Sequence, residues 1–192
     1  EPRQRLGKVL RQYSYAAPWG NSSEGELTDL PAITIEDLKS WYNSNVSPTL
    51  ANFHVAGNIG KEQIMKSLQN LASKWAAKEV AFPVYPVPAA LQKSEIFFVD
   101  VPGAKQSVLL IGNPSLAVSD ADYYPATVMN YILGVGGFAS RLTQELRESK
   151  GYTYGVRSGF SGSKEDGRFA ISSGVRSNVT LESTQAIKDI LV

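Results

Sequence analysis

The sequence predicts an α+β fold, with a mostly antiparallel sheet and helices packed on one face. Segments with helical spacing of apolar residues alternate along the chain with short strand-like segments. Two of these, 152–160 and 168–175, flank the stretch 161–167, whose Gly, Ser and Asp residues suit a hairpin connection. The 192 residues, 43% of them hydrophobic, suffice for one substantial core. We therefore expect a single domain over residues 1–192.

The first half of the chain is expected to contribute three helices and one strand. Apolar residues recur at helical spacing in three segments, 1–13, 35–46 and 61–75. Thr34, followed three residues later by Asp37, has the pattern of a capping box and predicts the start of the second helix. Residues 47–60 alternate between apolar and polar side chains and end in glycine, which predicts a strand followed by a turn.

Three prolines, Pro83, Pro86 and Pro88, follow the third predicted helix. Proline fits neither a helix interior nor a central strand, so these residues predict an extended connection. The connection could be a domain boundary or a crossover inside one domain. We favour the crossover, because a piece of half size on either side would have a thin core.

The second half predicts two strands before the hairpin and three helices around it. We expect the strands over 94–103 and 105–114, and the helices over 120–134, 139–150 and 179–192. Pro125 is tolerated in a first helical turn, Gly151 suits a C-cap, and Asn178 can cap the last helix. Because the last helical pattern runs to the end of the sequence, we expect an excised fragment of a longer protein.

Composition excludes several kinds of chemistry. The chain has no cysteine, which rules out disulfides, thiolate metal sites and cysteine nucleophiles. A zinc motif of the H-E-x-x-H kind needs two histidines, and this chain has one. That residue, His54, lies in a predicted strand and is expected to be structural, on a sheet face. A formal net charge of +1 offers no particular attraction for nucleic acid, and the longest apolar runs are too short to span a membrane.

Carboxylates occur in three close pairs, Glu36 with Asp37, Asp120 with Asp122, and Glu165 with Asp166. Paired acids can serve glycoside hydrolysis or bind hard cations. These pairs stand at predicted helix starts and turns, where negative charge is favoured for local reasons. We therefore assign them to local structure.

The glycines of GVGGFA, residues 134–139, match the weak form of the dinucleotide-binding fingerprint. That fingerprint needs a strand before the first glycine, so that the pyrophosphate meets the start of the following helix. Here a predicted helix precedes the glycines, and no acidic residue follows at the expected distance. We therefore reject a nucleotide site.

Arg147 and Tyr154 are the candidate site residues. Arg147 lies in the last turn of the predicted helix 139–150, and Tyr154 lies early in the next strand, so a tight turn can bring both to the same edge. Strand alternation places Tyr154 on one face with Val156. A guanidinium and a phenol can together hold a carbonyl oxygen or stabilise an oxyanion. The residues alone favour a simpler interpretation, in which Arg147 interacts with the helix dipole and salt-bridge partners and Tyr154 packs.

The segment GGFASRLTQELRESKGYTYGV, residues 136–156, closely resembles the signature of the insulinase/pitrilysin family of zinc metallopeptidases, which includes proteins like mitochondrial processing peptidase. The match is to the metal-free, C-terminal type of domain, in which an arginine and a tyrosine stand seven positions apart, as Arg147 and Tyr154 do. Residues 33–60 and 99–137 also resemble the helices and strands of that family in the same order. The resemblance therefore covers most of the chain.

The resemblance implies a metallohydrolase half-domain of the mitochondrial processing peptidase type, which binds substrate in a chamber formed with an H-x-x-E-H-bearing domain. Zinc is expected in that partner domain, in the same chain or in a partner subunit, and this fragment alone is expected to hold no cofactor and to be inactive. By resemblance, Arg147 and Tyr154 contact the peptide backbone and the developing oxyanion, and Gly136 and Gly137 form a substrate-binding loop. An extended peptide is expected to add to a sheet edge in the chamber.

An alternative is a catalytically inactive scaffold or peptide-binding subunit of the same family. The pair of Arg147 and Tyr154 argues against it, since a pure scaffold has no need of these residues. By resemblance alone, we also favour a secreted or periplasmic bacterial parent. The peptide substrate and the oligomeric state stay open.

Overall fold

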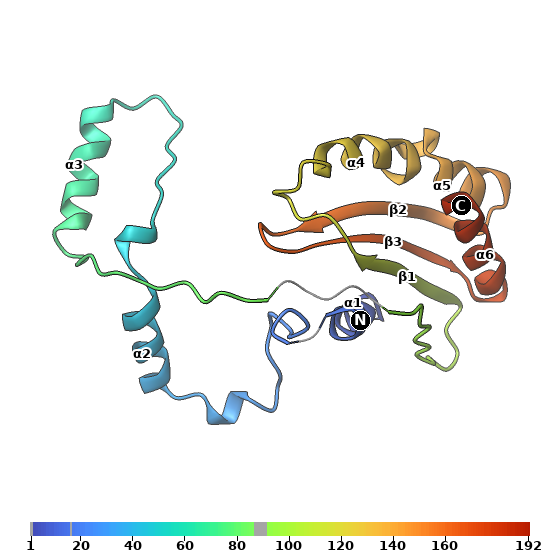
Figure 1. Cartoon of the computed structure of the whole chain (residues 1–192), viewed down its shortest axis with the longest axis horizontal. Coiled ribbons are helices and arrows are strands. Elements are labelled where there is room, and N and C mark those ends of the chain that lie inside the picture. The colour runs from blue at the N-terminus through green and yellow to red at the C-terminus, as the bar shows by residue number, and fades with distance from the viewer. Residues whose placement is uncertain (1, 16, 87–91) are drawn as a thin grey trace. The chain divides into compact units, whose positions relative to one another are not determined.

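The computed structural model describes residues 2–15, 17–86 and 92–192 of the chain. Its helices and strands are labelled in Figure 1. In order they are α1 (Pro2–Ser14), α2 (Ile35–Asn45), α3 (Lys61–Ala72), β1 (Gln106–Pro114), α4 (Tyr123–Asn130), α5 (Arg141–Thr143), β2 (Thr153–Gly162), β3 (Gly167–Arg176) and α6 (Thr180–Leu191). Two π-helical turns, Tyr131–Val135 and Gln144–Ser149, extend α4 and α5. The predicted α+β class is confirmed.

The chain forms two compact units. The first consists of Glu1–Glu24 and Pro86–Val192, and it holds the sheet with α1 and α4 to α6. The second, Gly25–Tyr85, holds α2 and α3. The break after Tyr85 coincides with the predicted proline connection: residues 76–86 form neither helix nor strand, and Pro88 lies outside the described residues. The expectation of one folding domain stays a prediction.

The sheet of the first unit has three antiparallel strands in the order β1-β3-β2. β3 is central, and β1 pairs with it over all nine of its residues. β2 and β3 form the predicted hairpin, in which the Ser163 N–H donates to the Asp166 carbonyl at 2.8 Å. The Ser163 hydroxyl also bonds the carboxylate of Asp166. This carboxylate therefore has the structural role in a turn that the sequence predicts for it.

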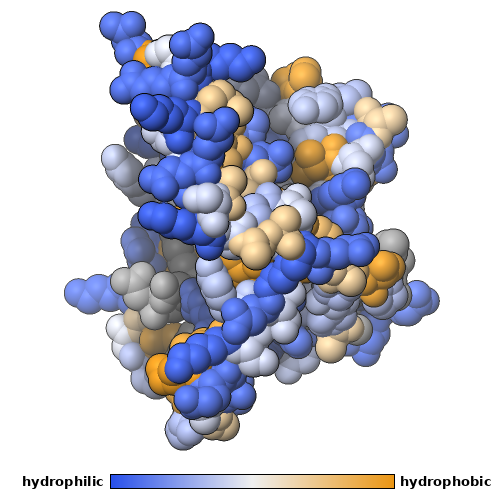
Figure 2. Space-filling view, turned by 90° about the vertical axis from the view of Figure 1, so that its left-hand side faces the viewer, coloured by the Kyte–Doolittle hydropathy of each residue, from blue (hydrophilic) through white to orange (hydrophobic). Residues whose placement is uncertain are grey.

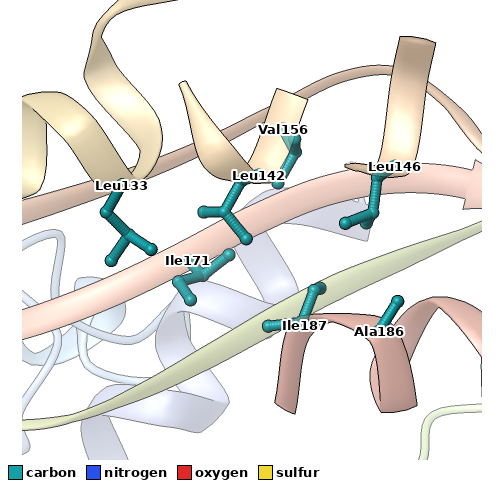
Figure 3. Packing of buried hydrophobic residues seen from close by; sticks show 7 residues of the cluster. All are labelled: Leu133, Leu142, Leu146, Val156, Ile171, Ala186 and Ile187. Carbon is teal, nitrogen blue, oxygen red and sulfur yellow. The ribbon is translucent and has the colours of Figure 1, made fainter. Parts of the chain in front are cut away.

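The core of the first unit lies between the sheet and the helices α4 to α6 (Figure 3). Leu142 and Leu146, which helical spacing assigns to the buried side, are fully buried in one cluster with Ile171 and Ile187. Each such side chain stabilises the fold by about 1.5–3 kcal/mol. This cluster fixes the helix that carries Arg147 against β2 and β3.

α1 lies across the sheet from α4 and α5, against β1 (Figure 1), so the helices are not confined to the one face that the sequence predicts. The Leu10 side chain lies 3.2 Å from the position that a Cβ would take on Gly112. The Tyr15 hydroxyl donates to the Gly167 carbonyl at 3.0 Å. Tyr13 stacks on Phe97, with ring centroids 3.9 Å apart. An apolar contact, a hydrogen bond and a ring stack thus attach α1 to the rest of this unit.

The second unit confirms the predicted capping box at the start of α2. The Thr34 N–H donates to Asp37 Oδ2 at 2.9 Å, and the Asp37 N–H donates to Thr34 Oγ1 at 3.1 Å. The Thr34 hydroxyl also donates to Asp37 Oδ2 at 2.7 Å, and this bond, followed by the one from the Thr34 N–H, holds the pKa of the Asp37 carboxyl below its usual value. Elsewhere in the unit, the Ser47 hydroxyl donates to the Lys78 carbonyl at 2.7 Å and accepts from the Lys78 N–H at 3.1 Å.

The apolar side of α2 is present, as helical spacing predicts, but it is exposed. Its members are Ile35, Leu38, Trp41 and Tyr42. No large apolar side chain is buried in the described unit Gly25–Tyr85. Figure 2 shows one face of the molecule, on which hydrophilic residues dominate and hydrophobic residues lie in separate places among them. Helical periodicity therefore predicted this helix but not its burial.

The strands predicted over 47–60 and 94–103 are not found in the described residues. The side chains of Ile96 and Phe98 are exposed, and no strand pairs with this segment. His54 is exposed and outside any strand, so its predicted place on a sheet face is also wrong. Alternation is a local property, whereas a strand needs a second strand to supply hydrogen-bond partners.

Asn178 does not cap the last helix. It lies inside a short 3₁₀ turn, Ser177–Val179, so that α6 begins at Thr180. The Thr180 hydroxyl lies 2.8 Å from both the Ser177 carbonyl oxygen and Ser107 Oγ. The predicted cap is wrong because the extra turn moves the helix start past Asn178.

Candidate functional site

The candidate site lies where the glycine-rich turn, α5 with its π-helical extension, and the start of β2 contact one another. Gly136 and Gly137 end the π-helical turn that follows α4. The Gly136 N–H donates to the Tyr131 carbonyl at 2.8 Å, and a Cβ on Gly136 would lie 2.8 Å from that oxygen. Gly137 has φ +61°, in the left-handed region that favours glycine. Both glycines are thus required locally, and the turn that they form leads to Phe138 at the surface.

The turn that carries Phe138 is hydrogen-bonded to the helix after it. The Ser140 N–H and hydroxyl both donate to the Gly137 carbonyl, at 3.2 and 2.9 Å. Gln144 Nε2 donates to the Phe138 carbonyl at 2.5 Å. The backbone of Phe138 is therefore held relative to the segment that carries Arg147.

Arg147 lies in the π-helical turn Gln144–Ser149, next to the buried Leu146. The turn ends as predicted at Gly151, whose φ is +60° and whose N–H donates to the Arg147 carbonyl at 3.1 Å. The Tyr152 N–H donates to the Leu146 carbonyl at 2.8 Å, which completes a glycine-type C-cap. The chain then enters β2 within two residues of Gly151, so Arg147 and Tyr154 lie close together.

A bulge at the start of β2 decides where Tyr154 points. Thr153 pairs with Val175, but the next pair is Val156 with Ser173, so β2 holds one extra residue there. Thr153 and Val156 are buried, while Tyr154 is 85% exposed. The prediction that Tyr154 and Val156 share a face is therefore wrong, because the bulge interrupts the two-residue period.

Buried hydroxyl groups stabilise this bulge. The Thr153 hydroxyl lies 2.6 Å from the Gly174 carbonyl oxygen, and it accepts from the Gly155 N–H at 3.0 Å. The Ser173 hydroxyl lies 3.0 Å from Thr153 Oγ1 and 3.1 Å from the Gly155 carbonyl oxygen. The backbone groups that the bulge removes from the ladder thus find side-chain partners.

Arg147 contacts two exposed aromatic rings. Its Cζ is 4.5 Å from the centroid of Phe138 and 4.7 Å from the centroid of Tyr154. Its Nε lies 3.3 Å from Glu148 Oε1. The prediction that Arg147 and Tyr154 project to the same edge is confirmed. The simpler interpretation, a salt bridge for Arg147 and packing for Tyr154, also has support. Arg147 forms an ion pair with Glu148, and the Tyr154 ring contacts the guanidinium.

This arrangement leaves hydrogen-bond donors free at the surface. Within the described residues, neither the Arg147 Nη atoms nor the Tyr154 hydroxyl has a recorded hydrogen bond. A guanidinium is permanently charged, and a phenol is a donor at neutral pH. Together they can bind an oxygen acceptor such as a peptide carbonyl or a carboxylate.

The described residues do not fit a metal site. No group of three or more His, Cys, Asp or Glu side chains among them could hold an ion. Glu36 and Asp37 lie in the first turn of α2, and the Asp122 N–H donates to Asp120 Oδ1 at 2.9 Å, as expected of structural carboxylates. In the described part of the chain, no helix is long and apolar enough to cross a membrane.

An open groove of about 680 Å³ lies near the site, between the Arg147 helix and α6. Its walls carry charges of both signs, among them Arg141, Glu182 and Asp189. Lys150 Nζ lies 3.2 Å from Glu145 Oε1 at its edge. Neither Arg147 nor Tyr154 lines the groove, so it is separate from the candidate site.

Sequence reasoning missed Phe138, Thr153 and Ser173. A phenylalanine directly after two glycines, where a turn at the surface is expected, is the sequence signal that could have pointed to Phe138. Gly155, in the middle of a predicted strand, could have indicated the bulge, because glycine in a strand often marks one. The hydrogen bond between the Thr153 and Ser173 hydroxyls joins residues twenty positions apart, so no local sequence pattern predicts it.

A family model and two bacterial relatives match most of this chain. The family model described as "Peptidase M16 inactive domain" matches residues 32–192. An uncharacterized zinc protease of Streptomyces coelicolor is 28% identical over 171 residues, which cover 87% of this chain and 37% of that protein. An uncharacterized zinc protease of Bacillus subtilis is also 28% identical, over 91% of this chain and 42% of that protein. The chain thus spans less than half the length of these relatives.

Solved structures agree with the family match. The crystal structure of a peptidase M16 inactive domain from Pseudomonas fluorescens has a TM-score of 0.91 and 26% identity, covering 100% of this chain and 46% of that one. A protease from Helicobacter pylori has a TM-score of 0.78 at 18% identity, covering 99% of this chain and 50% of that one. The second similarity concerns the fold alone.

Proposed function

Because the chain belongs to the family of peptidase M16 inactive domains, we propose that it is the metal-free, substrate-binding half of a zinc metallopeptidase. In this proposal, a zinc-bearing domain, in the same protein or in a partner subunit, forms a chamber with this half, and peptides are hydrolysed inside it. The zinc of that domain would supply an activated water. The proposal is supported by the names of the two bacterial relatives, each of which is called an uncharacterized zinc protease.

The observation that carries the proposal is the exposed pair of Arg147 and Tyr154. An arginine that contacts two rings and a tyrosine that is 85% exposed contribute little to the core. Their free donors instead suit an extended peptide, whose carbonyl oxygens need partners once they leave water. β2 is an edge strand of the described sheet, so a peptide could add to it beside Tyr154.

Each residue would act on a different stage of hydrolysis. Arg147 Nη groups would hold a peptide carbonyl in the bound substrate. The Tyr154 hydroxyl would donate a hydrogen bond to the scissile carbonyl oxygen as negative charge develops on it, while keeping its proton. Gly136 and Gly137 would form a substrate-binding loop, in which Gly136 lets the chain pass close to the Tyr131 carbonyl and Gly137 leaves open space at the position of a Cβ.

Substitution of Tyr154 by Phe in the complete enzyme tests this function. Loss of a donor that acts mainly in the transition state should lower kcat by roughly 100-fold, with a much smaller change in KM. The measurement is steady-state cleavage of a fluorogenic peptide that the wild-type enzyme hydrolyses. Tyr152→Phe is the matched control. Tyr152 is half-buried and lines the separate groove, so its hydroxyl is not part of the candidate site.

An unchanged kcat in the Tyr154→Phe enzyme would remove Tyr154 from the chemistry. If Arg147→Ala then weakened peptide binding without changing kcat, this half of the enzyme would bind peptides without acting on the chemical step. If neither variant changed binding or cleavage, the pair would have a structural role only.

A further inference from the structure

The Phe138 side chain has no role in the core, although its backbone is firmly held. Its ring is 62% exposed and lies outside the buried hydrophobic cluster. Three hydrogen bonds, from Ser140 and Gln144, fix the turn beneath it. A single exposed apolar side chain is common on protein surfaces, so the role of Phe138 has to be judged from the contact that its ring makes.

The contact that Phe138 makes is with the Arg147 guanidinium. The distance from Arg147 Cζ to the Phe138 centroid, 4.5 Å, is within the range of a cation–π interaction, as is the 4.7 Å to the Tyr154 centroid. Each ring contacts the guanidinium, and no direct contact between the two rings is found in the described residues. The two rings are therefore linked through the guanidinium that both contact.

Stacking of this kind determines which part of the guanidinium is available. Both rings contact the guanidinium near its Cζ atom, and Glu148 Oε1 lies 3.3 Å from Nε. The Nη groups have no hydrogen-bond partner among the described residues, and they form the edge of a guanidinium, where a planar oxygen acceptor binds best. Without a ring to lie against, a long arginine side chain samples many rotamers and loses entropy on binding.

We propose that Phe138 is a positioning residue that acts through Arg147: together with Tyr154 it holds the guanidinium plane so that the Nη edge faces a peptide carbonyl or carboxylate. The role in peptide binding rests on the proposed function, whereas the positioning of Arg147 does not. Phe138 would affect substrate binding without contacting the substrate itself.

The first test measures the position of Arg147 without using activity. In the complete protein labelled with ¹⁵N-arginine, the Arg147 Nε–H signal, assigned by its loss in Arg147→Lys, should show a ring-current shift. Phe138→Ala should move this signal toward the value of a solvated arginine, and Phe138→Tyr should largely keep it. An Arg147 signal that Phe138→Ala leaves unchanged would overturn the positioning role.

The second test uses cleavage of the fluorogenic peptide. Phe138→Ala should lower kcat/KM by roughly 3- to 10-fold, mainly through KM, in line with the modest strength of an exposed cation–π contact. Phe138→Tyr should restore the wild-type value, and Phe138→Leu, which keeps the bulk but not the ring, should not. In the Arg147→Ala background, Phe138→Ala should cause no further loss.

The outcomes separate the two proposals. An equal loss from Phe138→Ala with and without Arg147 would show that Phe138 acts on the substrate directly, which overturns the inference. If Arg147→Ala itself leaves cleavage unchanged, the proposed function of Arg147 fails, while the NMR shift still decides whether Phe138 positions it.

Discussion

At the scale of single residues, Thr153 lies at the centre of the hydrogen bonds that hold the bulge of β2. Its hydroxyl is close to the Gly174 carbonyl oxygen and accepts from the Gly155 N–H. The Gly155 carbonyl oxygen lies 2.9 Å from the same hydroxyl and 3.1 Å from the Ser173 hydroxyl. The exposure of Tyr154 therefore depends on a neighbouring side chain that never reaches the surface.

Thr153→Val tests this dependence, because valine keeps the shape and removes the hydroxyl. Loss of the hydrogen bonds that the Thr153 hydroxyl makes with the Gly155 N–H and the Gly174 carbonyl should lower the free energy of unfolding by about 1–3 kcal/mol. Urea denaturation measures this change. Thr127→Val, which removes an exposed hydroxyl bonded within α4, should change it by less than about 0.5 kcal/mol. Equal effects of the two substitutions would contradict a special role for Thr153.

At the scale of elements, α1 is fixed to the sheet by Tyr15. This residue is 7% exposed, and its hydroxyl donates to Gly167 at the start of β3. Burial, followed by the nearby Asp166 carboxylate, raises the pKa of the Tyr15 phenol above 10.0, while the charges of Arg168 and Arg11 oppose the rise. The folded state therefore favours the neutral phenol, which is also the form that can donate this hydrogen bond.

The stability that Tyr15 contributes should depend on pH. It is fully present below the unfolded pKa of about 10 and is lost as the pH rises through the higher folded pKa, because the unfolded state then releases its proton more readily. The urea midpoint should decrease between pH 8 and pH 10.5 in the wild type, and this decrease should be smaller in Tyr15→Phe. At pH 8 the variant should lose about 0.5–1.5 kcal/mol.

Tyr13→Phe is the control for this experiment, since the Tyr13 side chain is mainly exposed. It should retain the wild-type dependence on pH. A Tyr15→Phe chain with the same alkaline loss of stability as the wild type would show that other groups cause that loss.

At the scale of the whole molecule, the proposed function separates substrate binding, which it assigns to this chain, from the metal, which it assigns to another domain. It spans 37% and 42% of the two bacterial relatives described above, so the remaining parts of such proteins have room for a further domain. The donor set of this chain, with one histidine and no cysteine, is poor for zinc. The proposed function therefore assigns the zinc to the partner domain.

We predict that the chain of residues 1–192 holds no stoichiometric zinc. After incubation with excess zinc and removal of the free ion, elemental analysis should find well under about 0.1 zinc per chain, because tight sites need three or four converging ligands. One tightly held ion per chain would contradict this placement. In that case His54→Ala would show whether the single histidine is a ligand.

The sequence by itself determined those features that depend on neighbours along the chain. The capping box of Thr34 and Asp37, the glycine that ends the helix of Arg147, and the β2–β3 hairpin all involve residues a few positions apart, whose preferences act locally. The seven-residue step from Arg147 to Tyr154 also spans only a helix end and a tight turn. For this reason, the sequence could predict that both side chains reach the same edge, whereas their role in binding substrate comes from the family resemblance and stays a prediction.

Only the tertiary structure decided which strand-like segments pair and which side chains face outward. The segment 94–103 alternates as a strand does, but it has no strand beside it, and pairing depends on distant parts of the chain. Tyr154 is exposed because Ser173 and Thr153, which come from different strands, support a bulge. Phe138 and Arg147 meet because the core fixes their helix against the sheet. Contacts of this kind form only after the chain has packed, so local periodicity cannot specify them.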